Sequence, residues 1–276
     1  MSSNREAYFE ALKLDIPKTI IEFALKEVNG FSNLELTKNF DEEIKNYPFF
    51  KNAIKRYLDG EMMEYIFNKA YFLSTPFLVN KDVLIPRQET EQLVLRTIEL
   101  IREMFGDDRI NIADVCTGSG CIGISIAKAL PNNTYYLTDI SKEAFRVAKN
   151  NTNLLNNVDV KCLLGDMLDP LKGIKLDVIV CNPPYICKTE EIDERTWEQE
   201  PHLALLAEPA TIYYEKVLKD YSSIVKDKCL LAFEIGEDME EDLTKLIKKY
   251  CPNSLYFFEN DIYGKTRFLF IKQLGI

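Results

Sequence analysis

The sequence predicts an α/β fold with a parallel-rich sheet, preceded by a small helical domain. From residue 88 onward, short apolar runs typical of buried strands alternate with amphipathic helical segments. This alternation is typical of a sheet covered by helices on both faces. In the first 75 residues the apolar positions recur at helical spacing instead. The chain has 276 residues, 46% of them hydrophobic, which suffices for one large or two smaller domains.

Helices are expected in the N-terminal part at residues 17–28, 41–58 and 61–71. Pro17 suits the first turn of a helix, and the Asn-Gly and Asp-Gly pairs at 29–30 and 59–60 are typical breaks between helices. Residues 1–75 contain 10 basic and 12 acidic side chains. This part is therefore not a basic arm for nucleic acid.

Residues 74–87 have a different pattern. Apolar runs at 77–79 and 83–85 flank the turn-like sequence Asn80-Lys81-Asp82, and this arrangement favours a β-hairpin. We therefore expect a helical domain over residues 1–73, a hairpin linker over 74–87 and an α/β domain over 88–276.

The elements of the α/β part follow one another in a regular order. Helices are expected at residues 89–105, after Gly120, and at 141–155, 211–225 and 239–250. Strands are expected at 110–115, 134–138, 158–164, 176–181, 229–234, 255–258 and 267–271. The last two strands have no helix between them, so we expect an antiparallel pair at the edge of the sheet.

Charge and cysteine content limit the function classes. Lys and Arg number 34 against 44 Asp and Glu, a net charge of −10, and so acidic a chain is not expected to bind duplex nucleic acid through charge. His202 is the only histidine, and none of the seven cysteines forms a C-x-x-C pair, so no metal site is expected. The cysteine usage and the lack of a leader or a long apolar run favour a cytoplasmic protein without a membrane span.

A glycine-rich turn follows the first predicted strand of the sheet. Gly118 and Gly120 allow a ligand close to the backbone, and the helix after Gly120 offers unpaired N–H groups. Asp139 ends the next strand, 19 residues after Gly120, where an acid can accept hydrogen bonds from both ribose hydroxyls of a nucleoside. With Gly123 the spacing also satisfies G-x-G-x-x-G. A nicotinamide or flavin cofactor, or a turn needed only for packing, therefore stays open from this motif alone.

The tetrapeptide Asn182-Pro183-Pro184-Tyr185 follows the buried strand at 176–181. The carboxyl ends of parallel strands meet at one edge of a sheet, so the tetrapeptide should face the same crevice as the glycine turn. The Asn182 side-chain oxygen and the Pro183 carbonyl can accept both hydrogens of a planar –NH2 group, and Tyr185 offers a flat face beside it. Such a grip would place the nitrogen in line with a sulfonium methyl group. The pattern thus favours methylation of a conjugated amino group.

The tetrapeptide resembles the signature of S-adenosylmethionine-dependent amino methyltransferases, which include adenine-N6 nucleic-acid and glutamine-N5 protein methyltransferases. Residues 77–91, FLVNKDVLIPRQETE, resemble the segment before the catalytic domain in the bacterial HemK/PrmC family of release factor glutamine methyltransferases. Residues 56–65, 200–205 and 261–267 are similar to further parts of that family, so the resemblance covers nearly the whole chain. It implies a class I, Rossmann-like methyltransferase domain. The implied substrate is the glutamine of the Gly-Gly-Gln loop of class 1 peptide-chain release factors.

The resemblance also implies roles for individual residues. Cofactor contacts would come from Cys116, Thr117, Gly118, Ser119, Gly120, Asp139, Ile140, Asp166, Met167 and Asn182. Asn182, Pro183 and Tyr185 would be catalytic, and together with Pro184 they would bind the substrate glutamine. The cofactor would be S-adenosyl-L-methionine, converted to S-adenosyl-L-homocysteine, and residues 1–73 would take part in substrate recognition.

One position departs from the family. Cys116 stands where the family usually has glycine. A cysteine is expected to need ordinary backbone angles there and to add bulk beside the cofactor, so the departure bears on cofactor affinity. A small apolar filler is favoured over a nucleophile for this side chain.

Two further segments are candidates for the site. Arg87, Glu89 and Thr90 could close over the cofactor as a lid, and the same stretch also fits a helix start. Residues 186–206 form a long, acidic, poorly periodic stretch, and loops of this length are often functional. We expect this stretch to contact the release factor, with Trp197 as an anchor. We expect His202 to be a surface or loop-packing residue.

The sequence leaves other functions open. A ribosomal-protein glutamine and a nucleic-acid adenine are substrates of related enzymes, although net charges of −2 over residues 1–75 and −8 over the remainder argue against nucleic acid. A binding module with a decayed cofactor site is supported only by Cys116. A nicotinamide oxidoreductase would lack an acid or base for hydride transfer beside the turn. We expect a release factor as partner, and neither a membrane nor nucleic acid.

Overall fold

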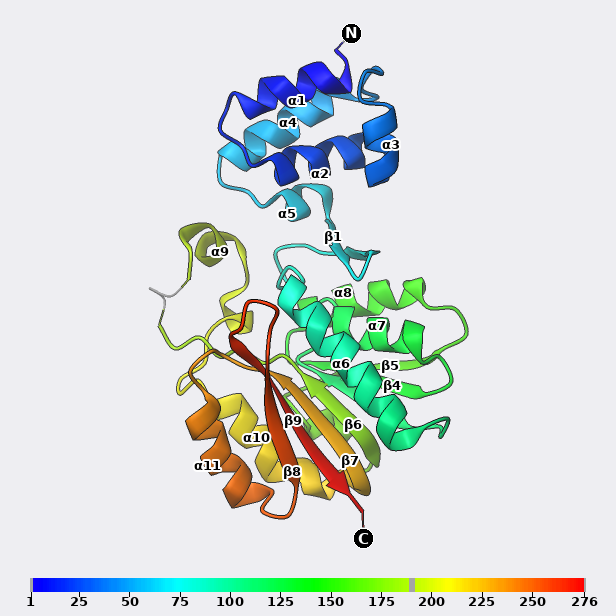
Figure 1. Ribbon diagram of the computed structural model, residues 1–276, viewed down its shortest axis with the longest axis vertical. Helices are drawn as coiled ribbons and strands as arrows, with labels where there is room; N and C mark the ends of the chain where they lie inside the picture. Colours follow the sequence, from blue (N-terminus) through cyan, green and yellow to red (C-terminus); the bar gives the residue numbers. More distant parts are fainter. Residues whose placement is uncertain (1, 189–191, 276) are drawn as a thin grey trace. The chain divides into compact units, whose positions relative to one another are not determined.

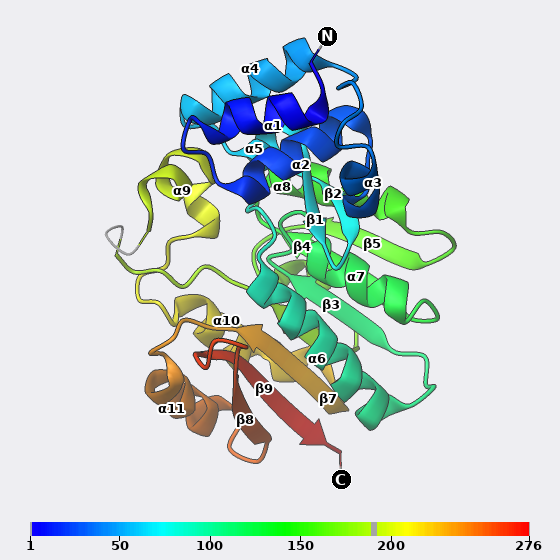
Figure 2. The same ribbon diagram turned by 45° about the horizontal axis from the view of Figure 1, so that its top comes forward.

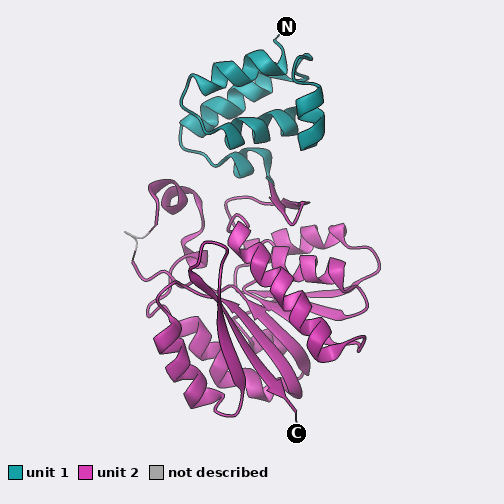
Figure 3. Cartoon of the chain, in the orientation of Figure 1, with its two compact units in different colours: residues 1–69 teal, residues 70–276 magenta. Residues whose placement is uncertain are grey.

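The computed structural model describes residues 2–188 and 192–275. The chain divides into two compact units, Met1–Lys69 and Ala70–Ile276 (Figure 3). The division falls a few residues before the boundary expected at residue 73, because a β-hairpin already starts at Lys69.

The first unit is helical, as the sequence predicts. Its described helices are α1 (Asn4–Leu12), α2 (Lys18–Asn29), α3 (Asn33–Lys38), α4 (Tyr47–Leu58) and α5 (Met63–Phe67) (Figure 1). Their apolar faces enclose a core in which Ile21, Ala24, Leu25, Phe50 and Met63 are buried. This core is the main source of stability for helices as short as these.

The spacing of apolar residues does not predict α1 or α3, and a capping box starts each of them. The hydroxyls of Ser3 and Ser32 accept hydrogen bonds from the backbone N–H groups of Glu6 and Glu35. The two glutamates in turn accept from the backbone of the serines. The S-x-x-E pattern is the sequence signal that could have identified both helices.

Two helix ends differ from the prediction in this unit. Helix α4 starts at Tyr47 instead of residue 41, because the Asn46 side chain accepts a hydrogen bond of 3.1 Å from the Phe49 N–H and caps the helix there. Helix α5 ends at Phe67 instead of residue 71, because Asn68 takes the left-handed conformation at φ +51°. The chain then enters a strand.

The predicted hairpin exists, but its position was wrong. Its strands are β1 (Lys69–Phe72) and β2 (Thr75–Leu78), and the turn residues Leu73 and Ser74 both have positive φ. Residues 79–87 form no strand. The side-chain oxygen of Asn80 accepts a hydrogen bond of 3.0 Å from the Asp82 N–H, and this local turn leads into extended chain that packs on other loops.

Within the described residues, the second unit contains a seven-stranded sheet of order β5-β4-β3-β6-β7-β9-β8 (Figures 1 and 2). The strands are β3 (Asn111–Val115), β4 (Thr134–Asp139), β5 (Asp159–Leu164), β6 (Leu176–Cys181), β7 (Val225–Glu234), β8 (Leu255–Asn260) and β9 (Thr266–Leu274). The five neighbouring strands β5, β4, β3, β6 and β7 are parallel, and β9 runs antiparallel to both β7 and β8. The expected antiparallel pair at the edge is therefore confirmed.

Helices cover both faces of this sheet, which confirms the predicted α/β architecture. The covering helices are α6 (Gln88–Phe105), α7 (Cys121–Ala129), α8 (Lys142–Asn151), α10 (Ile212–Asp220) and α11 (Glu240–Tyr250), and a further helix, α9 (Glu194–Gln199), lies in the loop after β6. Val178 and Val180 of β6 pack on the side of α6 and α7, whereas Ile179 and Cys181 pack on the side of α10 and α11. Burial on both faces explains why the strand reads as one continuous apolar run.

Gly123 allows α7 to lie close against the sheet. A Cβ atom at this position would stand 2.3 Å from Leu137 Cδ2 and 2.9 Å from Asp114 Cβ. The glycine pattern found in the sequence is therefore partly a packing requirement.

The variant Gly123→Ala should lower the free energy of unfolding by about 1–3 kcal/mol, because α7 must move away from β3 and β4. Urea unfolding followed by circular dichroism would measure the change. Ser125→Ala is the matched control, since Ser125 is buried on the same helix and its hydroxyl has no hydrogen-bond partner among the described residues. Equal stability of the two variants would contradict the packing argument.

Candidate active site

Two loops start side by side at the carboxyl edge of the sheet. In the parallel register, Val115 of β3 lies between Thr138 of β4 and Cys181 of β6. The glycine turn at Cys116 and the tetrapeptide at Asn182 therefore begin next to each other. The chain order of the sheet changes direction at β3, and open α/β sheets bind ligands at such a switch point.

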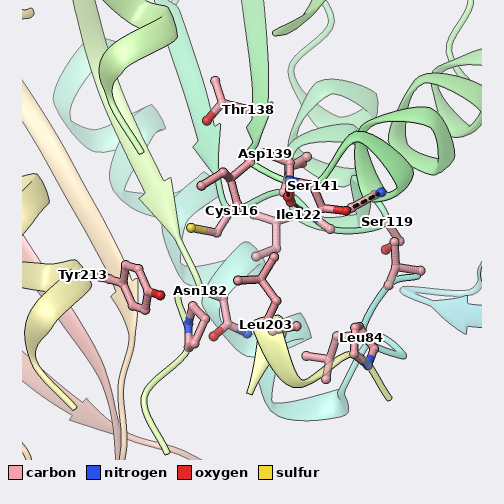
Figure 4. Close-up of a pocket in the computed structure, with 18 of the residues that line it drawn as sticks. Leu84, Cys116, Ser119, Ile122, Thr138, Asp139, Ser141, Asn182, Leu203 and Tyr213 are labelled. Carbon is pink, nitrogen blue, oxygen red and sulfur yellow. Dashed lines mark hydrogen bonds between the residues drawn. The ribbon is translucent and has the colours of Figure 1, made fainter. Parts of the chain in front are cut away.

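A cavity opens at this edge, and we name it the first cavity (Figure 4). Its lining includes Arg87, Thr90, Cys116, Thr117, Gly118, Ser119, Asp139, Ile140, Asp166, Met167, Asn182 and Pro184. It thus brings together the residues with an expected cofactor contact, except Gly120. Gly120 has φ +83°, and a Cβ atom there would stand 2.9 Å from Ile124 Cδ1.

A second cavity lies beside the first and is lined by the whole tetrapeptide. Its lining includes Arg87, Glu89, Asn182, Pro183, Pro184, Tyr185, Glu234 and Arg267. Leu84, Arg87, Asn182, Pro184 and Ala204 line both cavities. Asn182 and Pro184 of the tetrapeptide therefore border both compartments.

Asp139 holds the glycine turn in shape. One carboxylate oxygen accepts a hydrogen bond of 2.9 Å from the Gly118 N–H, and the other accepts one of 2.9 Å from the Ser141 N–H. Burial raises the pKa of this carboxyl, and the backbone donors lower it. Each oxygen keeps a further lone pair for a ligand hydroxyl.

Asp114 lies beneath the turn and is fully buried. Its Oδ2 atom accepts hydrogen bonds from the Thr117 hydroxyl at 2.6 Å and from the Gly123 N–H at 2.8 Å. Its Oδ1 atom has no hydrogen-bond partner among the described residues. Burial raises the pKa of Asp114 to about 7, although both hydrogen bonds lower it.

Cys116 has φ +59°, so the expectation of ordinary backbone angles at this residue was wrong. Val115 is the last residue of β3. Two residues later, the Thr117 N–H donates a hydrogen bond of 2.9 Å to the carbonyl of Thr138 in β4. The left-handed conformation allows both, at a cost of about 1–2 kcal/mol for a residue with a side chain. The Cys116 sulfur lies 3.5 Å from the Met167 sulfur, as expected for an apolar filler.

Asn182 is connected to helix α6 and strand β7 by hydrogen bonds. Its side-chain nitrogen lies 3.3 Å from the Thr90 hydroxyl, and that hydroxyl donates to Glu234 Oε2 at 2.6 Å. Glu234 is the last residue of β7 and is buried. Burial raises the pKa of Glu234 to about 7.

Tyr185 is also held from several sides. Gly236 lies against its ring, since a Cβ atom on Gly236 would stand 3.3 Å from Tyr185 Cδ2. Burial raises the pKa of the Tyr185 hydroxyl, and the positive charge of Arg267 lowers it. The ring is therefore fixed at the wall of the second cavity.

The loop after the tetrapeptide is anchored to the segment before α6. Residues 189–191 of the predicted loop lie outside the described residues. Of the rest, Ile186 and Leu206 form an isolated bridge that closes the loop. Glu200 is buried inside it, accepts a hydrogen bond of 3.0 Å from the Ile85 N–H and forms an ion pair with Arg87. The two segments therefore form one wall over both cavities.

The three lid candidates occupy different places. Arg87 lines both cavities, Thr90 lines the first and Glu89 lines the second. Arg87 directly precedes α6 but makes no side-chain cap. Its main partner is Glu200, so its role in holding the wall goes beyond a helix start.

The predicted loop contains a short helix, α9, which its sequence pattern does not predict. The side chain of Asp193 caps it by accepting a hydrogen bond of 3.0 Å from the Thr196 N–H. Trp197 stacks on His202 at 3.6 Å between ring centroids. The His202 ring also hydrogen-bonds the Trp197 carbonyl at 2.8 Å, so His202 is a loop-packing residue, as expected.

Sequence reasoning missed several residues that line the cavities. Glu234 ends a parallel strand, and the argument used for Asp139 could have found it. Tyr213 and Lys216 come from α10, and Lys216 forms an ion pair with Asp166 at 2.9 Å. No local sequence pattern marks α10 as part of the site, because the packing of the whole sheet decides whether α10 lies beside the cavity.

Comparison with known proteins identifies the family. A family model described as "Methyltransferase small domain" matches residues 93–199. The chain is 34% identical over 259 residues to "Release factor glutamine methyltransferase" of Bacillus cereus, and the match covers 91% of each chain. The chain belongs to the release factor glutamine methyltransferase family.

The solved structures similar to this family member agree with the fold. A methyltransferase from Pyrococcus furiosus has a TM-score of 0.54 and 17% identity, covering 82% of this chain and 100% of that chain. The N-terminal domain of human METTL16 in complex with SAH has a TM-score of 0.51 and 17% identity, covering 72% and 76%. The class I methyltransferase fold predicted from the sequence is therefore confirmed.

Among the described residues of this release factor glutamine methyltransferase family member, no helix has the length and apolar character needed to cross a membrane.

The buried carboxyl of Asp114 makes stability depend on pH. The pKa of Asp114 is higher in the folded state than its usual value of 3.8. The contribution of this carboxyl to the free energy of unfolding is therefore fully present below pH 3.8 and is lost as the pH rises through about 7. The variant Asp114→Asn keeps an oxygen acceptor for Thr117 and Gly123 without the charge. Relative to the wild type, it should therefore gain stability between pH 4 and pH 7.

Urea unfolding across this pH range would measure the difference. Asp107→Asn is the matched control, because Asp107 is exposed. A stability difference between Asp114→Asn and wild type that is constant with pH would contradict the prediction.

Proposed function

We propose that this protein transfers a methyl group from S-adenosylmethionine to the side-chain amide nitrogen of the glutamine in the Gly-Gly-Gln motif of class 1 release factors. One observation carries the proposal: Asn182 and Pro184 of the tetrapeptide line two cavities at once. A methyl transfer needs a donor and an acceptor brought together from opposite sides of one point. The name of the family's relatives supports the release factor as substrate.

The residues of the first cavity fit a nucleoside. A Cβ atom on Gly118 would have no heavy atom within 4 Å, so the backbone faces open space that a side chain would fill. The Asp139 carboxylate beside it suits a pair of ribose hydroxyls. Ile140 is 53% exposed and offers an apolar surface for a base. The complex of human METTL16 with SAH supports the same ligand class.

The residues of the second cavity would hold the glutamine amide. When bound, S-adenosylmethionine supplies an electrophilic methyl group. The amide nitrogen is a weak nucleophile because its lone pair is conjugated with the carbonyl group. The Asn182 side-chain oxygen and the Pro183 carbonyl would accept its two hydrogens, which orients the nitrogen and favours the positive charge that develops on it. Tyr185 would pack against the flat face of the amide.

The walls of the cavities support the same chemistry. The ion pair between Arg87 and Glu200 fixes the segment before α6 to the loop after the tetrapeptide. This wall would exclude water from the reacting atoms. We further propose that the helical unit Met1–Lys69 and the exposed parts of residues 186–206, including Trp197, contact the body of the release factor.

The variant Asn182→Ala should lose more than about 99% of methylation, because removing one preorganised hydrogen-bonding group typically costs a factor of about 100–1,000. The protein would be incubated with S-adenosylmethionine and a purified class 1 release factor. Peptide mass spectrometry would then detect one added methyl group on the Gly-Gly-Gln glutamine. Calorimetric titration with S-adenosylhomocysteine should give binding in wild type and variant.

Asn150→Ala is the control for this substitution, because Asn150 is exposed and lines neither cavity. It should methylate like the wild type. If the wild type binds the cofactor but adds no methyl group to the release factor, the proposed substrate is wrong. If it binds no cofactor, the proposed reaction is wrong.

A further inference from the structure

Glu234 and Thr90 lie outside the tetrapeptide, yet both connect to Asn182. Glu234 Oε2 accepts the Thr90 hydroxyl at 2.6 Å, and Thr90 Oγ1 accepts the Asn182 side-chain nitrogen at 3.3 Å. Both Glu234 and Thr90 are buried. Three residues from β7, α6 and the loop after β6 thus form one chain of hydrogen bonds.

The direction of this chain follows from the chemistry of its members. An ionised carboxylate only accepts, so Thr90 must spend its single hydroxyl hydrogen on Glu234. The Thr90 oxygen can then only accept, and the neighbour facing it must be a donor. Of the two ends of the Asn182 carboxamide, the nitrogen alone can fill this place. Asn182 is also among the groups that lower the pKa of Glu234, so its side chain lies in the same buried neighbourhood as the carboxylate.

The orientation of Asn182 decides what it offers to a substrate. The carboxamide is planar, so its oxygen points away when its nitrogen faces Thr90. In this orientation the Asn182 oxygen can accept a hydrogen bond from an incoming amide –NH2 group. In a flipped carboxamide, the –NH2 group of Asn182 would face the –NH2 group of the substrate, and neither could accept. A hydrogen-bond donor placed beside the nitrogen that receives the methyl group would disfavour the positive charge that forms on this nitrogen.

We propose that Glu234 and Thr90 are positioning residues that fix the side-chain amide of Asn182 with its oxygen toward the methyl acceptor. The inference rests on the proposed function for its consequence in catalysis, and on the hydrogen bonds alone for the orientation. Glu234 acts through Thr90, and neither needs to exchange a proton with the substrate.

The groups around Glu234 shift its pKa in opposite directions. They are Glu89 and Thr90 of α6, Cys121 of α7, Asn182 and Tyr185 after β6, Tyr214 of α10, and Arg267 of β9. Burial and Glu89 raise the pKa of Glu234 to about 7, while Thr90, Arg267 and Asn182 lower it. Protonated Glu234 can donate to Thr90, and Thr90 can then donate to a flipped Asn182. The orientation should therefore be fixed only above about pH 7.

The first test uses the protein without substrate. The side-chain ¹⁵N resonance of Asn182 would be identified by its loss in Asn182→Ala. We expect it to shift with a midpoint near pH 7 in the wild type and to show no such transition in Glu234→Gln. A wild-type resonance above pH 8 that is unchanged in Thr90→Val would overturn the proposal, whatever the substrate of the enzyme is, because the Asn182 nitrogen would then not depend on the Thr90 hydroxyl.

The second test uses kinetics with a class 1 release factor. Thr90→Val should lower kcat on the order of tenfold to a hundredfold, as expected for loss of one charge-linked hydrogen bond. Thr90→Ser keeps the hydroxyl and should restore most of the rate. KM for the release factor should change little, because most contacts of a protein substrate lie outside the amide.

Thr97→Val is the matched control, since Thr97 is buried on the same helix and lines neither cavity. Equal kcat for Thr90→Val and Thr97→Val would overturn the proposal, and so would a Thr90→Ser variant as slow as Thr90→Val. If the wild type shows the titration of Asn182 but methylates no release factor, the proposed function fails and the orientation of Asn182 stands.

Discussion

The parallel register of β3 and β6 is the constraint on which the site depends. It sets Val115 beside Cys181, so the next residue of each strand opens a loop at the same point of the sheet edge. A slip of one residue would exchange the side chains that β6 presents to its two buried faces, and their fit against the helices on each side would be lost. The register starts the glycine turn and the tetrapeptide side by side, and residues of both line the first cavity.

Three carboxyls stand along this edge, and each shapes a loop; Asp114 and Glu234 are buried, and Asp139 is half-buried. Asp114 supports the glycine turn from below, Asp139 ties its backbone to β4, and Glu234 reaches Asn182 through Thr90. Burial raises the pKa of all three, so each costs stability at neutral pH. Such costs are typical of sites where geometry has been favoured over stability.

Much of this arrangement could be predicted from the sequence, and the misses have physical reasons. The strand β6 and both loops at its edge follow from apolar runs and from glycine and proline chemistry. The hairpin β1–β2 was misplaced because its turn uses Leu73 and Ser74 at positive φ, residues that seldom mark a turn. The backbone of Cys116 was misjudged because the left-handed conformation is imposed by Thr117 and its hydrogen bond to β4. Side chains such as Tyr213 arrive through tertiary packing and leave no local signal.

The place of β9 has a consequence for the order in which the chain folds. β9 lies between β7 and β8, although it follows β8 in sequence. During synthesis on a ribosome the parallel strands β3 to β7 emerge first, and β8 finds no partner in the sheet until β9 exists. β8 can join the sheet only through β9. Arg267, which lines the second cavity, belongs to β9, so this cavity cannot be complete before β9 has paired with β7.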